Sequence, residues 1–164
     1  MFPADLIEDA SRLVADLRAR GLRLATAESC TGGLIVGALT EIPGASDVVE
    51  RGFVTYSNAA KIGMLGLDLE LITRHGAVSA EVACAMAAGA LRSAAADVAV
   101  AVTGVAGPGG GTLAKPVGLV HFALARSGTE PRHRERRFGD IGRGPVRLAA
   151  VREAFALIAD ELAS

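Results

Sequence analysis

The chain has 164 residues, 51% of them hydrophobic, a formal net charge of −1 at pH 7 and two cysteines. This length predicts a single domain over residues 1–164 with a sizeable core. No apolar run reaches the roughly eighteen residues of a membrane span, and the neutral charge gives no reason to expect a nucleic acid partner. Cys30 and Cys84 lack the spacing of a disulfide framework or a zinc site, and acidic N-terminal residues argue against a secretory signal. We therefore expect a cytoplasmic protein without a metal.

The first predicted element is a helix with its apolar residues at helical spacing. These residues are Leu6, Ala10, Leu13, Val14 and Leu17. Asp5 and Glu8 stand in capping-box positions at its start, and Gly21 is placed to end it. The helix is expected to be a packing element.

Five strands and five further helices follow in the predicted order. The strands cover 22–27, 52–57, 97–103, 117–125 and 132–138, and the helices cover 34–39, 59–65, 69–74, 79–95 and the residues from about 144 onward. The unbroken apolar strand at 97–103 is typical of a parallel sheet buried on both faces, and the last two strands predict an antiparallel hairpin. We therefore expect the α/β class, in the form of a single three-layer α/β/α domain with a mixed, mainly parallel sheet.

A polar turn separates the first strand from the second helix. It reads Ala27-Glu28-Ser29-Cys30-Thr31-Gly32-Gly33, and α/β sheets carry chemistry at turns of this kind. Ser29 is a candidate nucleophile, and the N–H groups of Gly32 and Gly33 are open to an anion or an acyl oxygen. The alternative is a plain N-cap, in which Ser29 or Thr31 accepts from the first helical amides. Cys30 is either a rival nucleophile or a small buried hydrophobe.

Lys61 follows the second strand, at the sheet edge where the Ser29 turn also lies if the two strands are parallel. A lysine can act as the base for a serine only where burial or a neighbouring cation lowers its pKa well below the ordinary value. The alternative is a solvated surface lysine at the start of a helix. Tyr56, at the end of the same strand, is placed either to orient Ser29 or Lys61 through its hydroxyl or to lie in the core.

A glycine tract follows the buried strand at 97–103. Five of the nine residues at 104–112 are glycine, which indicates either an anion nest or a flexible surface loop. The tract is neither a Walker loop nor a dinucleotide fingerprint, because Lys115 comes too late and Thr112 stands where a third glycine belongs.

Two groups of arginines follow the glycine tract. Arg132, Arg134 and Arg136 alternate on one strand face, a pattern more typical of a charged edge strand than of a phosphate site. Arg143, just before the last helix, is a candidate to hold a phosphate bidentately.

Taken together, these motifs resemble the CinA C-terminal domain family, whose stand-alone members are nicotinamide-nucleotide amidases. The matching stretches are 26–33, 52–58 with Lys61, 75–79, and 103–111 with 115–118. The resemblance implies hydrolysis of the carboxamide of nicotinamide mononucleotide to nicotinic acid mononucleotide and ammonia, within pyridine nucleotide recycling and without a metal or organic cofactor. It places the nucleophile on Ser29, the catalytic lysine on Lys61 and a supporting tyrosine on Tyr56.

The residues expected to bind the substrate are Cys30, Thr31, Gly32, Gly33, Asn58, Thr103, Gly104, Gly107, Gly110 and Arg143. The family's Gly-Asp-Arg element is kept only in part, because Gly142 directly precedes Arg143 and the nearest aspartate is Asp140. The expected partner is this small molecule, with no nucleic acid or membrane, and a homo-oligomer is left open. Two other classes stay open: a nucleotide-sensing module without turnover, and an interaction domain in DNA uptake or repair. Ammonia release would distinguish the amidase from both.

Overall fold

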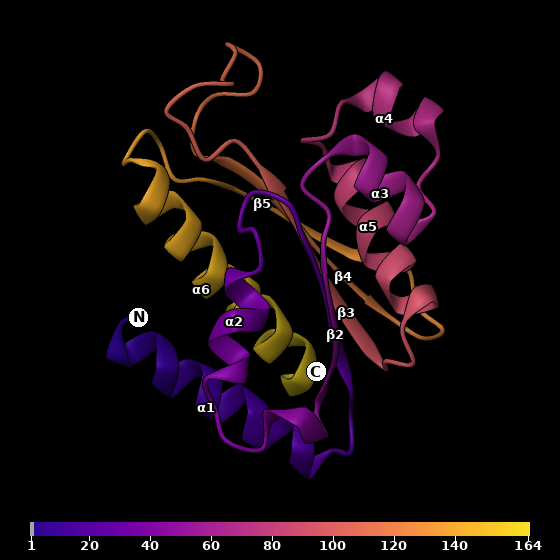
Figure 1. Cartoon of the computed structure of the whole chain (residues 1–164), viewed down its shortest axis with the longest axis vertical. Helices are drawn as coiled ribbons and strands as arrows, with labels where there is room; N and C mark the ends of the chain where they lie inside the picture. Colours follow the sequence, from indigo (N-terminus) through magenta and orange to yellow (C-terminus); the bar gives the residue numbers. More distant parts are fainter. Residues whose placement is uncertain (1) are drawn as a thin grey trace.

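The fold places helices on both sides of one sheet (Figure 1). The structure is a computed structural model that describes residues 2–164. Its helices are α1 (Ala4–Ala19), α2 (Leu34–Thr40), the short 3-10 helix η1 (Ala45–Asp47), α3 (Asn58–Leu65), α4 (Leu69–His75), α5 (Ala80–Ser93) and α6 (Arg143–Ala163). Its strands are β1 (Leu24–Glu28), β2 (Val49–Val54), β3 (Val98–Gly104), β4 (Leu119–Arg126) and β5 (Arg132–Arg137). None of the helices in residues 2–164 has the length and apolar content that crossing a bilayer requires.

The sheet is mixed, with strand order β2-β1-β3-β4-β5. β1 pairs in parallel with both β2 and β3, whereas β4 pairs antiparallel with β3 and with β5. Figure 1 shows α1, α2 and α6 on one face and α3, α4 and α5 on the other. The predicted fold class is therefore confirmed, and the carboxyl ends of β1, β2 and β3 meet at one edge of the sheet.

The two faces of the sheet carry side chains of different size. On the face toward α1, α2 and α6, β3 presents Val98, Val100 and Val102 to the larger apolar cluster. On the opposite face, the central strands present alanines to α5 at Ala25, Ala27, Ala99, Ala101, Ala123 and Ala125. Small side chains let a helix approach the strands closely, so the alanine face sets α5 and its neighbour α3 near the sheet.

Two details of the predicted elements are wrong. The strand expected at 52–57 runs from Val49 to Val54, because the chain turns away from the sheet after Thr55 and Ser57 caps α3. The capping box at Asp5 and Glu8 is absent: the N-cap of α1 is Pro3, without a side-chain cap. The Asp5 carboxylate instead forms an ion pair with Arg152 of α6 at 2.6 Å. The local pattern predicted Asp5 as part of a helix cap, whereas its side chain makes a tertiary ion pair.

The arginines of β5 lie on an edge strand, as the alternating pattern predicted. Arg134 pairs with Glu153 at 2.8 Å and with Asp160 at 2.7 Å, while Arg132 pairs with Glu161 at 2.8 Å. All three acids lie on α6. These guanidinium groups therefore attach α6 to the sheet edge. Because they are paired with carboxylates, they are not free to bind a phosphate.

Candidate active site

Ser29 directly extends β1 at the edge where the three parallel strands end. Its N–H donates to the Val102 carbonyl at 3.0 Å, so the ladder with β3 continues one residue past the strand. Side chains alternate along a strand, and Ala25 and Ala27 point to the α5 side. Ser29 therefore projects to the same side, the one that α3 covers.

Lys61 on α3 meets Ser29 there. The Lys61 side chain is 1% exposed, and its Nζ lies 3.2 Å from Ser29 Oγ and donates to the Thr55 carbonyl at 2.9 Å. The first turn of α3 is fixed by Ser57, whose hydroxyl accepts from the Ala60 N–H at 3.0 Å. The interpretation of Lys61 as a surface lysine is wrong, and the expected meeting of the two side chains is confirmed.

Burial lowers the pKa of Lys61 below its ordinary value. An ammonium loses hydration in this position, which favours the neutral amine. No carboxylate of residues 2–164 lies within ion-pairing distance of Nζ to oppose the effect. A neutral amine beside a serine hydroxyl can take its proton, so the pair has the arrangement of a nucleophile with its base.

Cys30 does not compete with Ser29. Its side chain is buried in the larger apolar cluster, and this burial raises the pKa of the thiol to about 12. The thiolate, which is the reactive form, is therefore scarce at neutral pH. Of its two interpretations, the small buried hydrophobe is confirmed.

Glu28 is the residue of this turn whose role the sequence interpretation missed. Its buried carboxylate accepts from the N–H groups of Gly33 and Ile35 at 3.0 Å and from that of Val36 at 2.9 Å. Glu28 thus caps α2, and the prediction of a cap by Ser29 or Thr31 is wrong. A charged residue at the end of a buried strand, six residues before the start of α2, was the available signal.

We expect Glu28→Ala to lower the free energy of unfolding by about 3 kcal/mol or more, because it leaves three N–H groups at the start of α2 without an acceptor. Urea denaturation followed by circular dichroism measures the change. Glu41→Gln, at the exposed opposite end of α2, is the matched control and should shift stability by no more than about 0.5 kcal/mol. Equal stability of the Glu28 variant and the wild type would show that water satisfies these amides.

The glycine amides of the turn are not open, contrary to the prediction. The Gly32 N–H donates to the Ser29 carbonyl at 3.1 Å, and the Gly33 N–H is one of the three that Glu28 accepts. The N–H groups of Cys30 and Thr31 donate to no other residue within 2–164. These two amides, rather than those of the glycines, are the candidates for an oxyanion hole.

Tyr56 and Arg143 form a hydrogen bond with each other. Tyr56 is 61% exposed, and its hydroxyl accepts from Arg143 Nη2 at 2.8 Å. Arg143 Nη1 donates to the Gly107 carbonyl at 2.9 Å. The prediction that Tyr56 lies in the core is therefore wrong. No hydrogen bond within residues 2–164 joins its hydroxyl to Ser29 or Lys61, and its supporting role stays a prediction. Arg143 joins the end of β2 to the glycine tract, and its role as a phosphate ligand stays a prediction.

The remaining predicted binding residues differ in their surroundings. Thr103 is buried and donates its hydroxyl to the Ala77 carbonyl at 2.8 Å, so it ties β3 to the loop before α5 and is not a free donor to a ligand. Gly104 lies so close to β4 that a Cβ would come within 2.8 Å of the Leu119 carbonyl oxygen. Asn58 is exposed at the start of α3, and Gly110 is exposed in the glycine tract. Their binding roles stay predictions.

The glycine tract forms the wall of a hollow beyond the end of β3. A cavity of about 480 Å³ is lined by Pro108, Gly109, Gly110, Gly111, Thr112, Leu113, Pro116 and Val117. Lys115 Nζ donates to the His75 carbonyl at 2.6 Å, and the Thr112 N–H donates to the Lys115 carbonyl at 2.9 Å. These bonds fold the tract back toward the α4–α5 connection, and the anion-nest interpretation of the tract stays a prediction.

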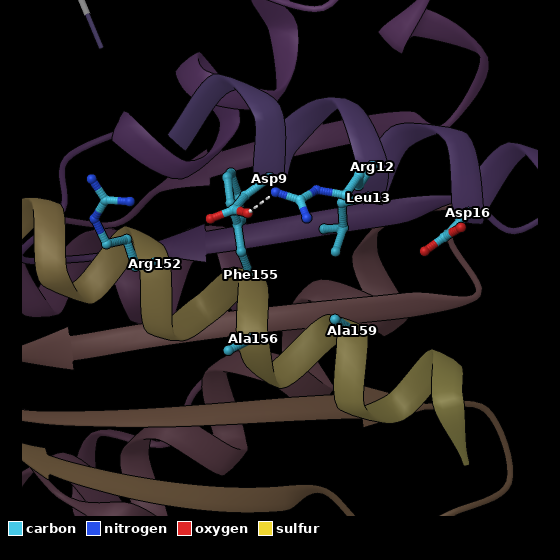
Figure 2. Close-up of a pocket in the computed structure, with 8 residues that line it drawn as sticks. All are labelled: Asp9, Arg12, Leu13, Asp16, Arg152, Phe155, Ala156 and Ala159. Carbon is cyan, nitrogen blue, oxygen red and sulfur yellow. Dashed lines mark hydrogen bonds and ion pairs between the residues drawn. The ribbon is translucent and has the colours of Figure 1, made fainter. Parts of the chain in front are cut away.

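A second hollow, of about 300 Å³, lies between α1 and α6 (Figure 2). Its apolar lining is Leu13, Phe155, Ala156 and Ala159, and its rim carries Asp9, Arg12, Asp16 and Arg152. Asp9 and Arg12 pair with each other at 2.9 Å. It contains no residue of the predicted site, so the chemistry is assigned to the Ser29 edge.

Comparisons with known proteins agree over most of the chain. The family model described as CinA C-terminal domain matches residues 7–162. A CinA-like protein of Synechococcus sp. is 51% identical over 159 residues, covering 96% of this chain and 38% of the relative, and one of Mycobacterium avium is 61% identical over 71% of this chain and 27% of the relative. The chain thus spans well under half of these relatives. The crystal structure of the competence/damage inducible protein CihA from Agrobacterium tumefaciens is 54% identical and matches with a TM-score of 0.96, covering 100% of this chain and 99% of that one.

Proposed function

Because the chain belongs to the CinA C-terminal domain family, we propose that it hydrolyses the carboxamide of nicotinamide mononucleotide, giving nicotinic acid mononucleotide and ammonia. The observation that carries the chemistry is the buried Lys61 amine 3.2 Å from Ser29 Oγ. The choice of substrate rests on the family resemblance of the motifs.

In the first half of the proposed reaction, Ser29 Oγ attacks the carboxamide carbon while its proton passes to Lys61 Nζ. The carbonyl oxygen becomes an oxyanion, and the free N–H groups of Cys30 and Thr31 are placed in the same turn to stabilise it. When the tetrahedral intermediate collapses, the C–N bond breaks and Lys61 returns its proton to the leaving ammonia. An acyl ester on Ser29 remains.

In the second half, water resolves the acyl ester. Lys61 Nζ accepts a proton from the water, the hydroxide attacks the acyl carbon, and the Ser29 alkoxide leaves and takes the proton back. The net change is an amide and water converted to a carboxylic acid and ammonia. Each step uses Lys61 once as a base and once as an acid, so its pKa must lie where both forms are populated.

The ribose phosphate is assigned to Arg143 and the glycine tract. Within residues 2–164 the Arg143 guanidinium donates to two neutral oxygens, those of Tyr56 and Gly107, and a phosphate would be a stronger acceptor than either. The tract and Arg143 are in direct contact, so one anion can be bound by both.

We expect purified protein in EDTA to release ammonia from nicotinamide mononucleotide, and to act on nicotinamide riboside with a kcat/KM at least about tenfold lower. Loss of one charge-assisted hydrogen bond to the phosphate accounts for that factor, and remote binding energy also positions the reacting carbonyl. Chromatography of the pyridine products, with coupled ammonia detection, measures both rates.

The riboside serves as the internal control for phosphate recognition. Equal kcat/KM for the two substrates would remove the phosphate role from Arg143 and the glycine tract. Binding of the mononucleotide in calorimetry without ammonia release would instead contradict the amidase and favour a nucleotide-sensing module.

A further inference from the structure

The side chain of Arg147, on α6, binds the backbone of the turn that carries Ser29. Its Nε donates to the Cys30 carbonyl at 3.1 Å and its Nη2 to the Thr31 carbonyl at 2.8 Å. The arginines of β5 that pair with α6 contact carboxylates, whereas Arg147 uses a bidentate guanidinium on two consecutive peptide groups of the turn that carries Ser29. A rigid fork fixes two carbonyl directions at once, which a lysine cannot do.

The direction of these carbonyls determines the direction of the amides that follow them. The Cys30–Thr31 and Thr31–Gly32 peptides are trans, since the only cis bond in residues 2–164 joins Gly107 to Pro108. In a planar trans peptide the C=O and the next N–H point in opposite directions. The Thr31 N–H therefore points away from Arg147.

The two catalytic side chains lie on the side to which that N–H points. Arg147 belongs to α6, which packs on the valine face of the sheet, while Lys61 lies on α3 on the alanine face (Figure 1). The Gly32 N–H is already taken by the Ser29 carbonyl. The Thr31 N–H has no acceptor in another described residue, and it points away from the α6 face, on which Arg147 lies, toward the face that α3 and Lys61 cover.

Thr31 carries a second unsatisfied group. Its Oγ1 is fully buried and has no hydrogen-bond partner among residues 2–164. Buried hydroxyls are nearly always paired, and this unpaired one lies in the same residue as the unpaired N–H.

We propose that Arg147 is a positioning residue that holds the Thr31 N–H in place as an oxyanion donor for Ser29. This inference deepens the proposed amidase and rests on it for its substrate. The hydrogen bonds that the Arg147 side chain makes within residues 2–164 go to the carbonyl oxygens of Cys30 and Thr31.

The test compares Arg147→Ala and Arg147→Lys with Arg152→Ala, a control on the same helix whose partner is Asp5. We expect Arg147→Ala to lower kcat on nicotinamide mononucleotide by about 30- to 100-fold with KM within about threefold, because a misplaced oxyanion donor affects the transition state more than the bound substrate. The kcat of Arg147→Lys, whose amine can bind one carbonyl, should lie between those of the wild type and Arg147→Ala. Added guanidinium should restore part of the rate of Arg147→Ala but should not raise the rate of the other variants.

A second readout does not depend on amidase activity. Phosphonylation of Ser29 by a fluorophosphonate, followed by intact mass, uses the same oxyanion donors and should slow by a similar factor in Arg147→Ala but not in Arg152→Ala. Slow labelling of Arg147→Ala in a protein that never releases ammonia would support the role of Arg147 while the proposed function fails. Labelling of Arg147→Ala at the wild-type rate, a change in KM alone, or a wild-type Ser29 that is not labelled would each overturn the inference. If Arg147→Ala proves unfolded by circular dichroism, the Arg147→Lys comparison carries the same three outcomes.

Discussion

Ser29→Ala is expected to abolish ammonia release from nicotinamide mononucleotide, lowering kcat by about 10⁴-fold or more. The variant lacks the oxygen that forms the acyl ester, and neither of its neighbours in the turn can replace it. The Cys30 thiol is held protonated by burial, with a pKa raised to about 12, and the Glu28 carboxylate is occupied by the amides of α2. Binding of the mononucleotide should change by less than about tenfold, since the hydroxyl contributes to the covalent step and little to phosphate recognition.

Single-turnover assays and calorimetry on the same preparation separate these two effects. Cys30→Ala is the matched control, one residue along the same turn, and should keep its rate within about threefold because it removes only a buried thiol. An active Ser29→Ala beside an inactive Cys30→Ala would reverse the assignment of the nucleophile.

The meeting of Ser29 and Lys61 was expected from the sequence on the condition that their two strands are parallel neighbours, and β1 and β2 meet that condition. Ser29 and Lys61 each lie just beyond a strand, and parallel neighbours bring their carboxyl ends to one edge of the sheet. The alternating arginines of β5 likewise predicted an edge strand, since charge along one face suits the last strand of a sheet. These are consequences of local pattern and topology together.

The residues that the sequence did not reveal act through long-range contacts with the backbone or with a distant side chain. Arg147 and the turn that it holds are more than a hundred positions apart, and nothing in either segment encodes the pairing. Arg143, 87 positions from Tyr56 in the sequence, likewise donates a hydrogen bond to the Tyr56 hydroxyl. The β2 boundaries also depended on a neighbour, because β1 sets where pairing begins and ends. Local periodicity carries no information about such partners.

Burial of Lys61 without an acidic partner also predicts how stability varies with pH. The pKa of Lys61 is lower in the folded protein than in the unfolded chain, so between the two values the unfolded chain binds more protons. The free energy of unfolding contributed by this group therefore rises with pH across that window. Below the folded pKa the protein carries the full cost of a buried ammonium, and the cost is relieved as the pH rises.

The same lowered pKa makes Lys61 the most informative residue to replace. Because the reaction needs the neutral amine, kcat/KM of the wild type should rise with pH through a group below the ordinary lysine pKa and then level off. Lys61→Arg should lose at least about 10³-fold in kcat, since a guanidinium keeps its proton at every usable pH. Lys61→Met should be equally inactive yet more stable than the wild type, with the difference largest at low pH, because it buries no charge.

Lys115→Arg provides the matched control for this substitution, since Lys115 is the other lysine of the chain and uses its amine to bind the His75 carbonyl. An arginine can make that bond, so the control should keep most of its rate and the same pH profile. A Lys61→Arg variant with more than about a tenth of the wild-type rate would reduce Lys61 to a fixed positive charge near the substrate. Glu28 could not then be the base, because its carboxylate is capping α2. A water would then have to accept the proton of Ser29, and the pH dependence of kcat/KM would persist in Lys61→Met.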